Sequence, residues 1–374
     1  MRTQICLVSA QAVPNLIPTL DDTLKPERVI LVTSPDMRAQ TEYLSRVMKR
    51  RGLIVKQLDI PNAYDYAGIE DTLLNWLSEN ETTDVTLNVT GGTKLMAMAA
   101  QSVFDSSKKP IFYINIETDD IIFLRQRDQA RKLNARIKLR DYLEANGYTP
   151  AEKPENPSIT AALRQLADRV IDYVQSAGKA LGQFNSLAEQ AKNDLCITMP
   201  EQRFCAAYLM DIITLFEDSN LLTLQKNQIR FSSETARKFA NGGWLEFHIH
   251  RVLSDLRPET GITDSATNML ITHPDGKTRN ELDAAFLHRN RLHIIETKTA
   301  NLTLPGKQDS KATEAIYKLE SLLKLGGLRT RAMLIDYRGG LNNADKKRAE
   351  QSHIQVVSGS QLKNLKGILR HWLQ

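Results

Sequence analysis

Cysteine is scarce in this chain of 374 residues, and long apolar runs are missing from it. The three cysteines, Cys6, Cys196 and Cys205, are too few and too scattered for a disulfide framework or a zinc cluster, so we expect them to be small core residues. No stretch approaches the roughly 18 to 20 unbroken apolar residues of a membrane span. The opening MRTQICLVSA lacks the basic segment and the cleavage site of a signal peptide. These absences predict a cytoplasmic protein with no membrane association.

The composition also argues against disorder and against a single small module. Hydrophobic residues make up 41% and charged residues 25%, which is ordinary for a soluble globular protein, and the length predicts two or three domains. The net charge of +5 is unevenly spread. Residues 1–150 are neutral and residues 151–243 carry −1, whereas residues 244–374 carry +6, with 20 Lys and Arg against 14 Asp and Glu. A basic C-terminal end indicates a polyanionic partner.

Short apolar runs alternate with longer amphipathic stretches over residues 1–125. This alternation is typical of β-α-β units, which build a mainly parallel sheet with helices on both faces. The runs predict strands at Ile5–Ser9, Val29–Ser34, Leu53–Asp59, Val85–Thr90 and Ile111–Asn115. A sixth run, Ile121–Arg125, follows a tight turn and is expected to pair antiparallel at an edge.

A segment with three prolines, GYTPAEKPENPS at residues 147–158, predicts an extended linker. The periodicity is then helical from Ile159 to about Glu217, and Leu221–Ser233 predicts a hairpin that turns at Lys226–Gln228. Helices followed by a hairpin are typical of a DNA-reading winged-helix module and also of bundle-like connectors. The predicted organisation is a first domain at 1–147, a helical or winged-helix-like connector at 158–240 and a third domain at 241–374.

The third domain contains the stretch NELDAAFLHRNRLHIIETKTA, residues 280–300, in which two alternating runs flank an Arg-Asn dipeptide. This pattern predicts a β-hairpin. A loop of two or four residues sets Asp283 opposite Glu296. It likewise sets Glu281 opposite Lys298, so three carboxylates and one lysine share one face. An odd loop would send the two halves of the set to opposite faces.

Acidic side chains on a half-buried face repel one another unless a cation lies among them. Mg²⁺ or Mn²⁺ supplies that charge, because both prefer hard oxygen ligands and keep bound waters. We expect Asp283 and Glu296 to bind the metal directly, and Lys298 to orient or deprotonate the attacking water and to offset charge at the phosphorus. The plainer interpretation is a ladder of surface ion pairs, which contributes little to stability.

The segment before the hairpin, Gly242–Leu253, has helical spacing with apolar residues for the core. Glu246 lies one turn from its glycine pair, where a helix brings a third carboxylate to the metal. His248 and His250 do not share one helix face, so we expect solvated or cap-side histidines there and no zinc site. After the hairpin, Lys311–Leu325 predicts an amphipathic helix whose Tyr317 and Lys318 face the cleft or the nucleic acid, and Ala332–Gly339 predicts another central strand.

This C-terminal pattern resembles the PD-(D/E)XK nuclease superfamily. The matching residues are Glu246, Asp283, Glu296 and Lys298, with Glu281 beside them and twelve residues between the aspartate and the second motif. Leu282 stands where the motif often has proline. The resemblance implies a restriction-endonuclease-like domain that hydrolyses phosphodiesters with Mn²⁺ or Mg²⁺.

In the first domain, NVTGGTKLMAMAAQSVF at residues 88–104 places a glycine pair and a lysine between a strand and an apolar helix. Ligands of parallel sheets bind beyond the carboxyl ends of the strands, where such a turn exposes backbone N–H groups. Gly91 and Gly92 let a phosphate or ribose approach the backbone. Hydroxyls and a positive charge come from Thr90, Thr93 and Lys94. The spacing is not that of a Walker loop, and a plain tight turn is the alternative.

Other strand ends point to the same edge of the predicted sheet. Small hydroxyl and amide groups follow three of the strands, at Ser9, Gln11, Thr33, Ser34 and Asn115. Such groups suit ribose and base edges, so the pattern favours a nucleotide-like ligand.

The turn from Asn88 to Lys94 resembles that of CARF domains, the CRISPR-associated Rossmann-like sensors. A CARF domain joined to a PD-(D/E)XK domain is similar to the CARF nucleases of the type III CRISPR response. The resemblance implies cyclic tetra-adenylate as an allosteric activator bound by the residues named above. It also implies a homodimer, with the helix at Leu95–Phe104 between sheet and partner, and DNA as the substrate, nicked or cut as a single strand, with RNA as a further candidate.

Two alternatives remain open. One is a transcription regulator that responds to cyclic oligoadenylate, in which residues 159–233 read DNA and an inactive C-terminal domain only dimerises. Such a regulator has no need of the acidic hairpin face. The other is a repair or restriction nuclease with an unrelated sensor.

Overall fold

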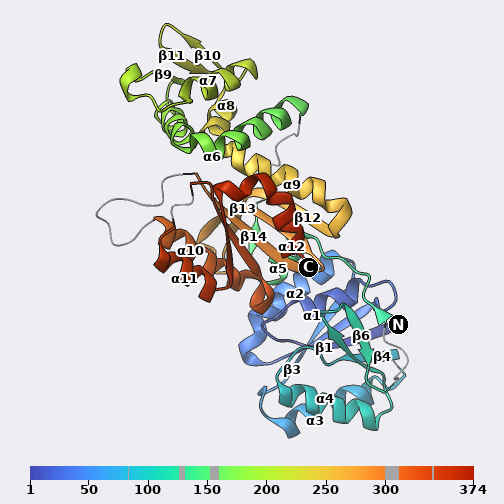
Figure 1. Ribbon diagram of the computed structural model, residues 1–374. Helices are drawn as coiled ribbons and strands as arrows, with labels where there is room; N and C mark the ends of the chain where they lie inside the picture. Colours follow the sequence, from blue (N-terminus) through green and yellow to red (C-terminus); the bar gives the residue numbers. More distant parts are fainter. Residues whose placement is uncertain (83, 126–130, 152–159, 300–310, 339–340) are drawn as a thin grey trace. The chain divides into compact units, whose positions relative to one another are not determined.

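The structure is a computed structural model that describes residues 1–82, 84–125, 131–151, 160–299, 311–338 and 341–374 (Figure 1). It divides into two compact units. Unit 1 contains Met1–Ala151, Ile271–Asn280 and Leu325–Leu328, and unit 2 contains Glu152–Leu270, Glu281–Lys324 and Arg329–Gln374. The middle segment therefore belongs to the same compact unit as most of the C-terminal segment. The greater part of the predicted linker, residues 152–158, lies outside the described residues.

Unit 1 is built on a seven-stranded sheet in the order β3-β2-β1-β4-β5-β6-β7. Its strands are β1 (Arg2–Leu7), β2 (Arg28–Thr33), β3 (Ile54–Asp59), β4 (Asp84–Asn88), β5 (Ile111–Asn115), β6 (Asp120–Phe123) and β7 (Arg131–Lys132). β1 to β5 pair in parallel and β6 pairs antiparallel with β5, as predicted. β1 begins before its apolar run, because the polar residues Thr3 and Gln4 are buried in the sheet.

Helices cover both faces of this sheet, and β2 is therefore buried along its whole length. The helices are α1 (Val13–Leu16), α2 (Arg38–Arg50), α3 (Tyr66–Glu79), α4 (Lys94–Ser106) and α5 (Leu139–Ala145), with 3-10 turns η1 (Ile17–Leu20) and η2 (Pro35–Met37). α3 and α4 pack together over one face, where they bury the apolar side chains of β1, β2 and β4. The predicted α/β architecture of this part is confirmed.

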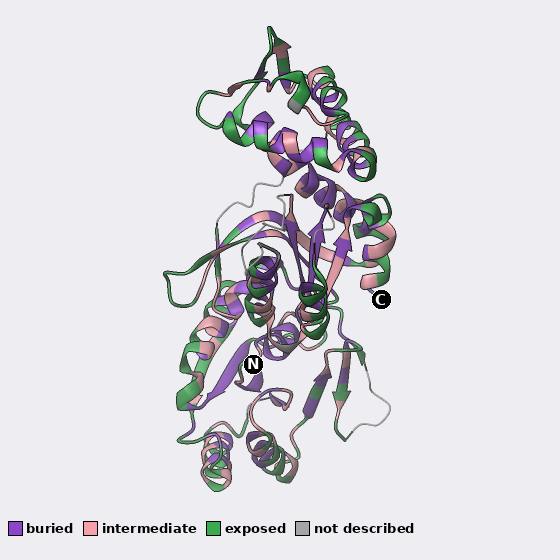
Figure 2. Cartoon of the chain, turned by 60° about the vertical axis from the view of Figure 1, so that its left-hand side comes forward, coloured by how far each residue is buried: buried purple, intermediate pink, exposed green. Residues whose placement is uncertain are grey.

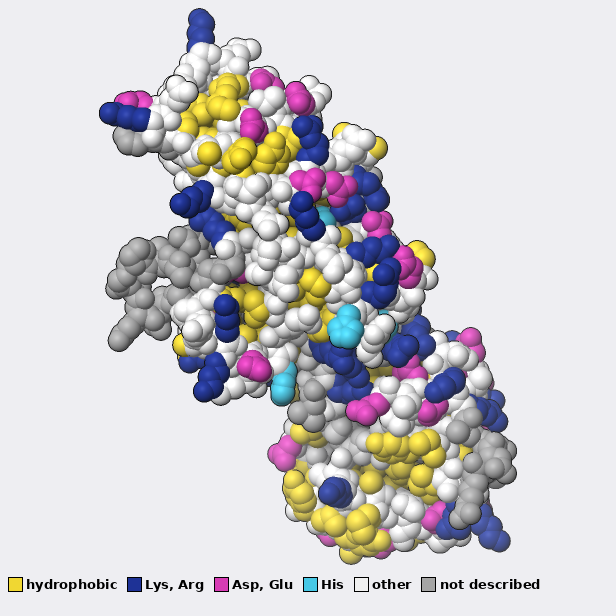
Figure 3. Space-filling view, in the orientation of Figure 1, with side chains coloured by type: hydrophobic (Ala, Val, Ile, Leu, Met, Phe, Trp, Pro, Cys, Tyr) yellow, Lys and Arg dark blue, Asp and Glu magenta, His cyan; other side chains and the backbone are white. Residues whose placement is uncertain are grey.

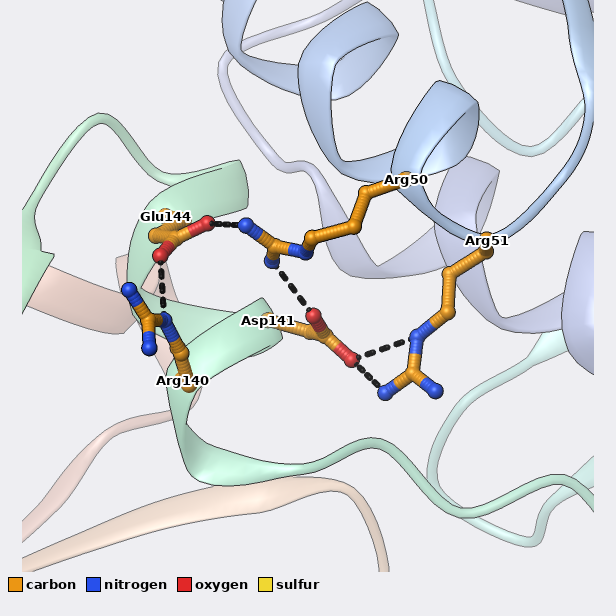
Figure 4. A network of polar contacts seen from close by, with 5 residues as sticks. All are labelled: Arg50, Arg51, Arg140, Asp141 and Glu144. Atoms are coloured by element: carbon orange, nitrogen blue, oxygen red, sulfur yellow. Dashed lines mark hydrogen bonds and ion pairs between the residues drawn. The ribbon is translucent and has the colours of Figure 1, made fainter. Parts of the chain in front are cut away.

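α5 is held against α2 by a network of charged side chains (Figure 4). The buried Asp141 accepts hydrogen bonds from Arg50 and Arg51. Glu144 pairs with Arg50 and with Arg140 of its own helix. Because the Asp141 carboxylate is shielded from water, these contacts are stronger than those of an exposed pair. The network fixes the last helix of unit 1 before the linker.

A second sheet has the order β16-β15-β14-β13-β12-β8. Its strands are β8 (Thr149–Pro150), β12 (Ile262–Thr272), β13 (Arg279–His288), β14 (Arg291–Lys298), β15 (Arg331–Asp336) and β16 (Ile354–Ser358). β14, β15 and β16 run parallel, whereas β13 pairs antiparallel with β14. The helices around it are α9 (Trp244–Thr260), α10 (Lys311–Leu323), α11 (Asn343–Gln351) and α12 (Leu365–Trp372), with 3-10 turns η5 (Lys324–Arg329) and η6 (Gly359–Asn364). The predicted helices and strand of this part are therefore observed.

The middle segment is mainly helical. It contains α6 (Ala161–Gln190), η3 (Gln202–Phe204), α7 (Leu209–Asp218), α8 (Glu234–Lys238) and the π-helical turn η4 (Phe239–Gly243). A three-stranded sheet in the order β10-β11-β9 consists of β10 (Leu222–Gln225), β11 (Gln228–Phe231) and β9 (Cys196–Thr198). The predicted hairpin turns at Lys226–Asn227, where both residues have positive φ. β9 interrupts the stretch that was predicted to be helical throughout.

One hydrophobic core connects this middle segment with the second sheet. It runs from Leu166 of α6 through Trp244 of α9 and Ile295 of β14 to Leu369 of α12. Figure 2 shows the central strands as buried and the helices with one buried and one exposed face. Among the described residues, no helix is both long and apolar enough to cross a membrane. Cys6 is buried as expected, whereas Cys196 and Cys205 are only partly buried.

His293 of β14 is a buried core residue. Its ring stacks on Phe286, and Trp372 packs edge-on against it. Burial lowers the pKa of the imidazole from 6.5 to about 3. The unfolded chain therefore takes up a proton at His293 at a pH where the folded chain does not. The free energy of unfolding falls as the pH drops below about 6.5.

We predict that His293→Phe removes about 2 kcal/mol of the acid-induced loss of stability between about pH 8 and about pH 5. Phenylalanine keeps the stacking and has no proton to take up. Urea denaturation at both pH values measures the effect. His371→Gln, which removes an exposed imidazole, is the control. The same pH dependence in His293→Phe as in the wild type would contradict the assignment.

Candidate functional site

The β13–β14 hairpin turns at Arg289 and Asn290, which both have positive φ. This is the even, two-residue loop that the sequence argument required. Positive φ at both central positions is the backbone of a type I′ turn, whose twist matches that of the flanking strands. The resulting register, continued by one step, sets Asp283 opposite Glu296. The even loop is therefore observed, while a shared metal-binding role of Asp283 and Glu296 stays a prediction.

Glu296 is fully buried, and two lysine ammonium groups contact its carboxylate. Lys298 Nζ lies 2.5 Å from Oε1, while Lys318 Nζ lies 2.7 Å from Oε2 and 2.9 Å from Oε1. Lys298 comes from the same strand and Lys318 from α10. A buried carboxylate is costly unless it is paired and hydrogen-bonded. The two ammonium groups satisfy that requirement in this structure.

The charges of this cluster shift one another's protonation. Burial raises the pKa of Glu296 and the Asp283 carboxylate adds to the rise, while the two ammonium groups oppose it. Burial acts to lower the pKa of Lys298, yet this pKa is raised because nearby carboxylates, Glu296 above all, favour the charged form. Lys298 is therefore an ammonium group, which suits water orientation and charge offset better than proton abstraction.

Glu246, in the first turn of α9, belongs to the same electrostatic cluster. Burial raises its pKa to about 7, and the negative charges of Asp283, Glu281 and Glu296 add to the shift. A hydrogen bond with Asn268 of β12 acts in the opposite direction. Burial and the three neighbouring carboxylates therefore both act against the charged form of Glu246.

The carboxylates do not converge on a single point. Asp283 Oδ2 accepts hydrogen bonds from Thr297 N at 2.7 Å and Thr297 Oγ1 at 2.9 Å, and Glu281 is exposed. Within the described ranges, no three His, Cys, Asp or Glu side chains are grouped closely enough to hold a metal ion as they stand. The donor set nevertheless fits Mg²⁺ or Mn²⁺ chemically, because it offers carboxylate oxygens with unoffset negative charge. In this arrangement Glu296 is engaged by its lysines and Asp283 by Thr297.

The glycine pair before α9 lets the start of that helix approach the end of β14. Gly242 has a φ of 103°, and a side chain there would collide with Thr299, the residue after Lys298. The pair lies in the π-helical turn η4, a type of turn that is frequent at functional sites. This close approach sets the first turn of α9, and with it Glu246, beside the acidic strand end.

His248 and His250 are both buried, so the prediction that they are solvated is wrong. Burial lowers the pKa of His248 to about 4 and also lowers that of His250. His248 Nδ1 lies 3.1 Å from Arg251 Nη2. The reason is that α9 packs against both α6 and α12, so helix positions that a polar side chain would normally expose lie inside.

In unit 1 the turn between β4 and α4 is built around Asn88, whose side chain is buried. Asn88 Oδ1 accepts hydrogen bonds from Thr90 N at 3.0 Å and Thr90 Oγ1 at 2.6 Å. Thr90 Oγ1 in turn accepts a hydrogen bond from Ile114 N of β5. Thr93 caps α4 by accepting a hydrogen bond from Met96 N. These contacts fix the turn at the carboxyl ends of β4 and β5.

The glycine pair of this turn serves close packing. A Cβ atom at Gly91 would lie 2.2 Å from the carbonyl oxygen of Leu7. Gly92 has a φ of 77°, and a Cβ atom there would lie 2.9 Å from Leu7 Cβ. The turn therefore lies directly against the end of β1, and only glycine permits this approach. Contact of the glycines with a ligand stays a prediction.

The other predicted ligand residues lie at or just after the ends of β1, β2 and β5. Thr33 is fully buried, and its hydroxyl is hydrogen-bonded to that of Thr41 at 2.9 Å. Ser34 is also buried. At least partly exposed are Ser9, Gln11, Thr90, Thr93, Lys94 and Asn115. The groups available at this edge in the present arrangement are therefore mainly those beside β1, β4 and β5.

Comparison with protein families assigns both ends of the chain. Residues 3–142 match the Card1 CARF domain, and residues 233–374 match the Card1-like endonuclease domain. The chain therefore joins a Card1-type CARF domain to a Card1-like endonuclease domain, which makes it a CARF endonuclease. No curated protein matches the chain.

Solved structures agree with this assignment. Protein VC1899 from Vibrio cholerae is 26% identical with a TM-score of 0.91, and the match covers 100% of this chain and 98% of that chain. Can2 from Sulfobacillus thermosulfidooxidans, solved in complex with cyclic tetra-adenylate, is 28% identical with a TM-score of 0.81, covering 99% and 97%. A type III CRISPR defence DNA nuclease activated by cyclic oligoadenylate is 18% identical with a TM-score of 0.59, covering 90% and 45%. At that identity the last match shows the fold alone.

These matches confirm a CARF domain at the N-terminal end of the chain and an endonuclease domain at the C-terminal end. The endonuclease match contradicts the transcription-regulator alternative, because that alternative required an inactive C-terminal dimerisation domain. A sensor unrelated to CARF domains is contrary to the match of residues 3–142.

Two further residues of the CARF endonuclease, which the sequence pattern did not predict, lie near its acidic cluster of Glu246, Glu281, Asp283 and Glu296. Asn268 hydrogen-bonds with Glu246, and the buried Asp336 of β15 stands beside Lys298 in the parallel register. Lys318 had been expected at the cleft, but its contact with Glu296 had not. The position of Asp336 at a strand end is a signal that could have pointed to it, whereas nothing in the sequence around Asn268 does so.

We predict that Gly91→Ala lowers the free energy of unfolding of the CARF endonuclease by about 1 to 3 kcal/mol, because the added methyl overlaps the Leu7 carbonyl. Urea denaturation measures the change. The control is Gly178→Ala in α6, where an added Cβ meets no atom within 4 Å. It should be neutral or stabilise the protein by up to about 1 kcal/mol. Equal stability of Gly91→Ala and the wild type would show that the turn can move away from β1.

Proposed function

We propose that this CARF endonuclease is metal-dependent and is activated by cyclic tetra-adenylate bound to its CARF domain. Support for the activator comes from Can2, which is 28% identical over nearly the whole chain and was solved with this ligand. DNA is the proposed substrate, nicked or cut as a single strand, and RNA is a further candidate. The excess of basic residues over 244–374 supports a polyanionic substrate.

The observation that carries the metal-dependent part is the buried Glu296 carboxylate among three further acids, paired within the described part of the chain with two lysines. Asp283, Glu296 and Glu246 would hold Mn²⁺ or Mg²⁺. When bound, such an ion polarises a phosphodiester oxygen and makes a bound water a better nucleophile.

The lysines and the outer glutamate have separate proposed roles. The Lys298 ammonium orients the attacking water and offsets negative charge that develops at the phosphorus. Lys318 remains beside Glu296 when Lys298 turns toward the phosphate, so the buried carboxylate keeps one partner. Glu281 is exposed on β13, and its negative charge adds to the rise of the Glu246 pKa.

The proposed activator site is the rim at the carboxyl ends of the CARF strands. Partly exposed hydroxyl and amide groups there suit ribose and base edges, and the exposed Lys94 suits a phosphate. The backbone N–H groups at the start of α4 add a favourable environment for an anion. Thr33 is bonded to Thr41, so its hydroxyl has to exchange partners before it can bind the ligand.

The proposed quaternary structure is a homodimer, in which two CARF domains present the same groups to the two halves of a ligand with two-fold symmetry. Exposed apolar side chains support a partner on unit 1. Met98 of α4 is 58% exposed and Leu74 of α3 is 46% exposed. Figure 3 shows hydrophobic side chains gathered over these two helices. Such a patch is costly in water and is typical of an interface.

We expect sedimentation equilibrium to give twice the chain mass of 42.2 kDa. Met98→Glu should shift the protein toward single chains, because it places a charge in the proposed interface. Met210→Glu, which changes an exposed apolar side chain of unit 2, is the matched control. A single-chain mass for the wild type would refute the homodimer.

For the endonuclease, we expect Glu296→Gln to reduce cleavage at least about a hundredfold, because the neutral amide keeps the volume and loses the negative charge. Calorimetric titration with cyclic tetra-adenylate should give near wild-type affinity. EDTA should stop cleavage by the wild type, and Mn²⁺ should restore it. Glu350→Gln, at an exposed position of α11, is the control.

Two outcomes would count against parts of this function. Equal cutting with and without cyclic tetra-adenylate would remove the activation. Loss of ligand binding in Glu296→Gln would mean that the roles of the two domains are wrongly assigned.

A further inference from the structure

A groove of about 560 Å³ opens in unit 2 between the middle of α6 and two loops. Its walls are formed by residues 174–180 of α6, residues 206–208 before α7, and Tyr337 and Arg338 after β15. Its volume falls within the range of about 300 to 1,000 Å³ that is typical of sites for small ligands. None of the acidic cluster's carboxylates lines it, so the groove is separate from the candidate active site.

The groove lies at the same end of the sheet as the acidic cluster. In the parallel β14–β15 pair, Lys298 stands beside Asp336, and Arg338 follows two residues later. Neighbouring strands are about 4.8 Å apart. The Tyr337 hydroxyl lies 3.4 Å from the carbonyl oxygen of Gly178, which seats α6 on this strand end. The groove and the cluster therefore lie at the ends of neighbouring strands, so that one bound polymer can contact both.

The walls combine an aromatic surface with positive charge. Tyr208 is 51% exposed, and Lys179 is exposed. Among the described residues, neither Lys179 nor Arg338 forms an ion pair, and no lining side chain is acidic. Exposed aromatic rings stack with unpaired bases of any sequence, and cations beside them bind the phosphates. This chemistry matches an unpaired nucleic-acid strand and does not match an apolar ligand.

The local backbone keeps the groove open. Gly182 faces Arg338 so closely that a Cβ atom would overlap the guanidinium, whereas a Cβ atom at Gly178 would meet nothing within 4 Å. Ala177 has non-helical dihedral angles and kinks α6 between the two walls. Tyr208 has a φ of 71°, a left-handed conformation that is strained for an aromatic residue. Gly182 thus leaves room for the Arg338 guanidinium, and Gly178 leaves open space in the groove.

We propose that this groove is a strand-binding subsite of the endonuclease, where an unpaired base stacks on Tyr208 and the adjoining phosphate pairs with Lys179 and Arg338. The inference rests on the proposed nuclease function, and it adds a site on the middle segment that positions the strand for cleavage. Tyr208, Lys179 and Arg338 act here as positioning residues, because they do not touch the scissile bond.

The test uses the full-length chain with Glu296→Gln in every variant, so that labelled oligonucleotides are bound and not cut. Fluorescence anisotropy in the presence of cyclic tetra-adenylate measures the affinity for single-stranded DNA, for single-stranded RNA and for a blunt duplex. Tyr208→Asn, which suits a positive φ, should weaken single-strand binding about tenfold. Tyr208→Phe should stay within about twofold, because the ring is kept.

The helix supplies a second, independent variant. Gly178→Phe should fill the groove and weaken single-strand binding about tenfold, while Gly178→Ala should leave it unchanged. Thermal melting shows whether each variant is folded. Unchanged single-strand affinity in folded Tyr208→Asn and Gly178→Phe would overturn the proposal, and so would equal losses for single strands and duplex.

These results are distinguishable from a failure of the proposed function. If protein with Glu296 intact does not cut, but strand binding still depends on Tyr208, the strand-binding subsite is supported and the proposed nuclease function is refuted. If the enzyme cuts in response to the activator and strand binding does not depend on Tyr208, the subsite is refuted and the proposed function is not. The DNA and RNA arms show which strand the groove takes.

Discussion

The endonuclease domain depends on how one buried carboxylate is neutralised. Glu296 has no exposed surface, and the ammonium groups of Lys298 and Lys318 are its direct partners. Burial raises the pKa of the neighbouring Glu246 to about 7, and the charges of the nearby carboxylates add to that rise. The charges of Asp283, Glu281 and Glu296 thus act on Glu246, while Lys298 and Lys318 contact the Glu296 carboxylate. A divalent cation bound at the cluster would reduce the repulsion between these carboxylates, and this relief would contribute to its binding free energy.

Both functional regions use glycine to bring a helix start against a strand end. Gly91 lies where a side chain would overlap Leu7 at the end of β1, and Gly242 lies where it would overlap Thr299 after β14. In each case the following helix, α4 or α9, begins within a few residues. The positive end of a helix dipole is thereby held at the sheet edge, where anionic groups gather. The same packing device thus sets a helix start at the proposed ligand edge in one domain and at the acidic cluster in the other.

The features that could be predicted from the sequence are those set by local pattern. The acidic face of the hairpin followed from alternation and from the Arg289-Asn290 loop, because an even loop fixes which residues share a face. The parallel sheet of the CARF domain followed in the same way. Burial of His248 and His250 did not, because it depends on α6 and α12, which come from distant parts of the chain. The place of Asp336 beside Lys298 depends on a register between strands separated by α10, and no local pattern encodes such a register.

The middle segment is part of the endonuclease core and not only a spacer. Hydrophobic side chains of α6 and α7 pack in one cluster with those of α9, β14 and β15, so neither set can be buried without the other. Residues 233–374, which match the endonuclease family, therefore exclude helices that complete their core. The kink at Ala177 lies where α6 contacts Tyr337. Tyr337 follows Asp336, which stands beside Lys298 in the β14–β15 pair. Because close-packed interiors transmit displacement, a shift of α6 requires repacking at the strand end that carries the acidic cluster. The orientation of that helix is accordingly a determinant of the geometry in which the carboxylates meet their lysines.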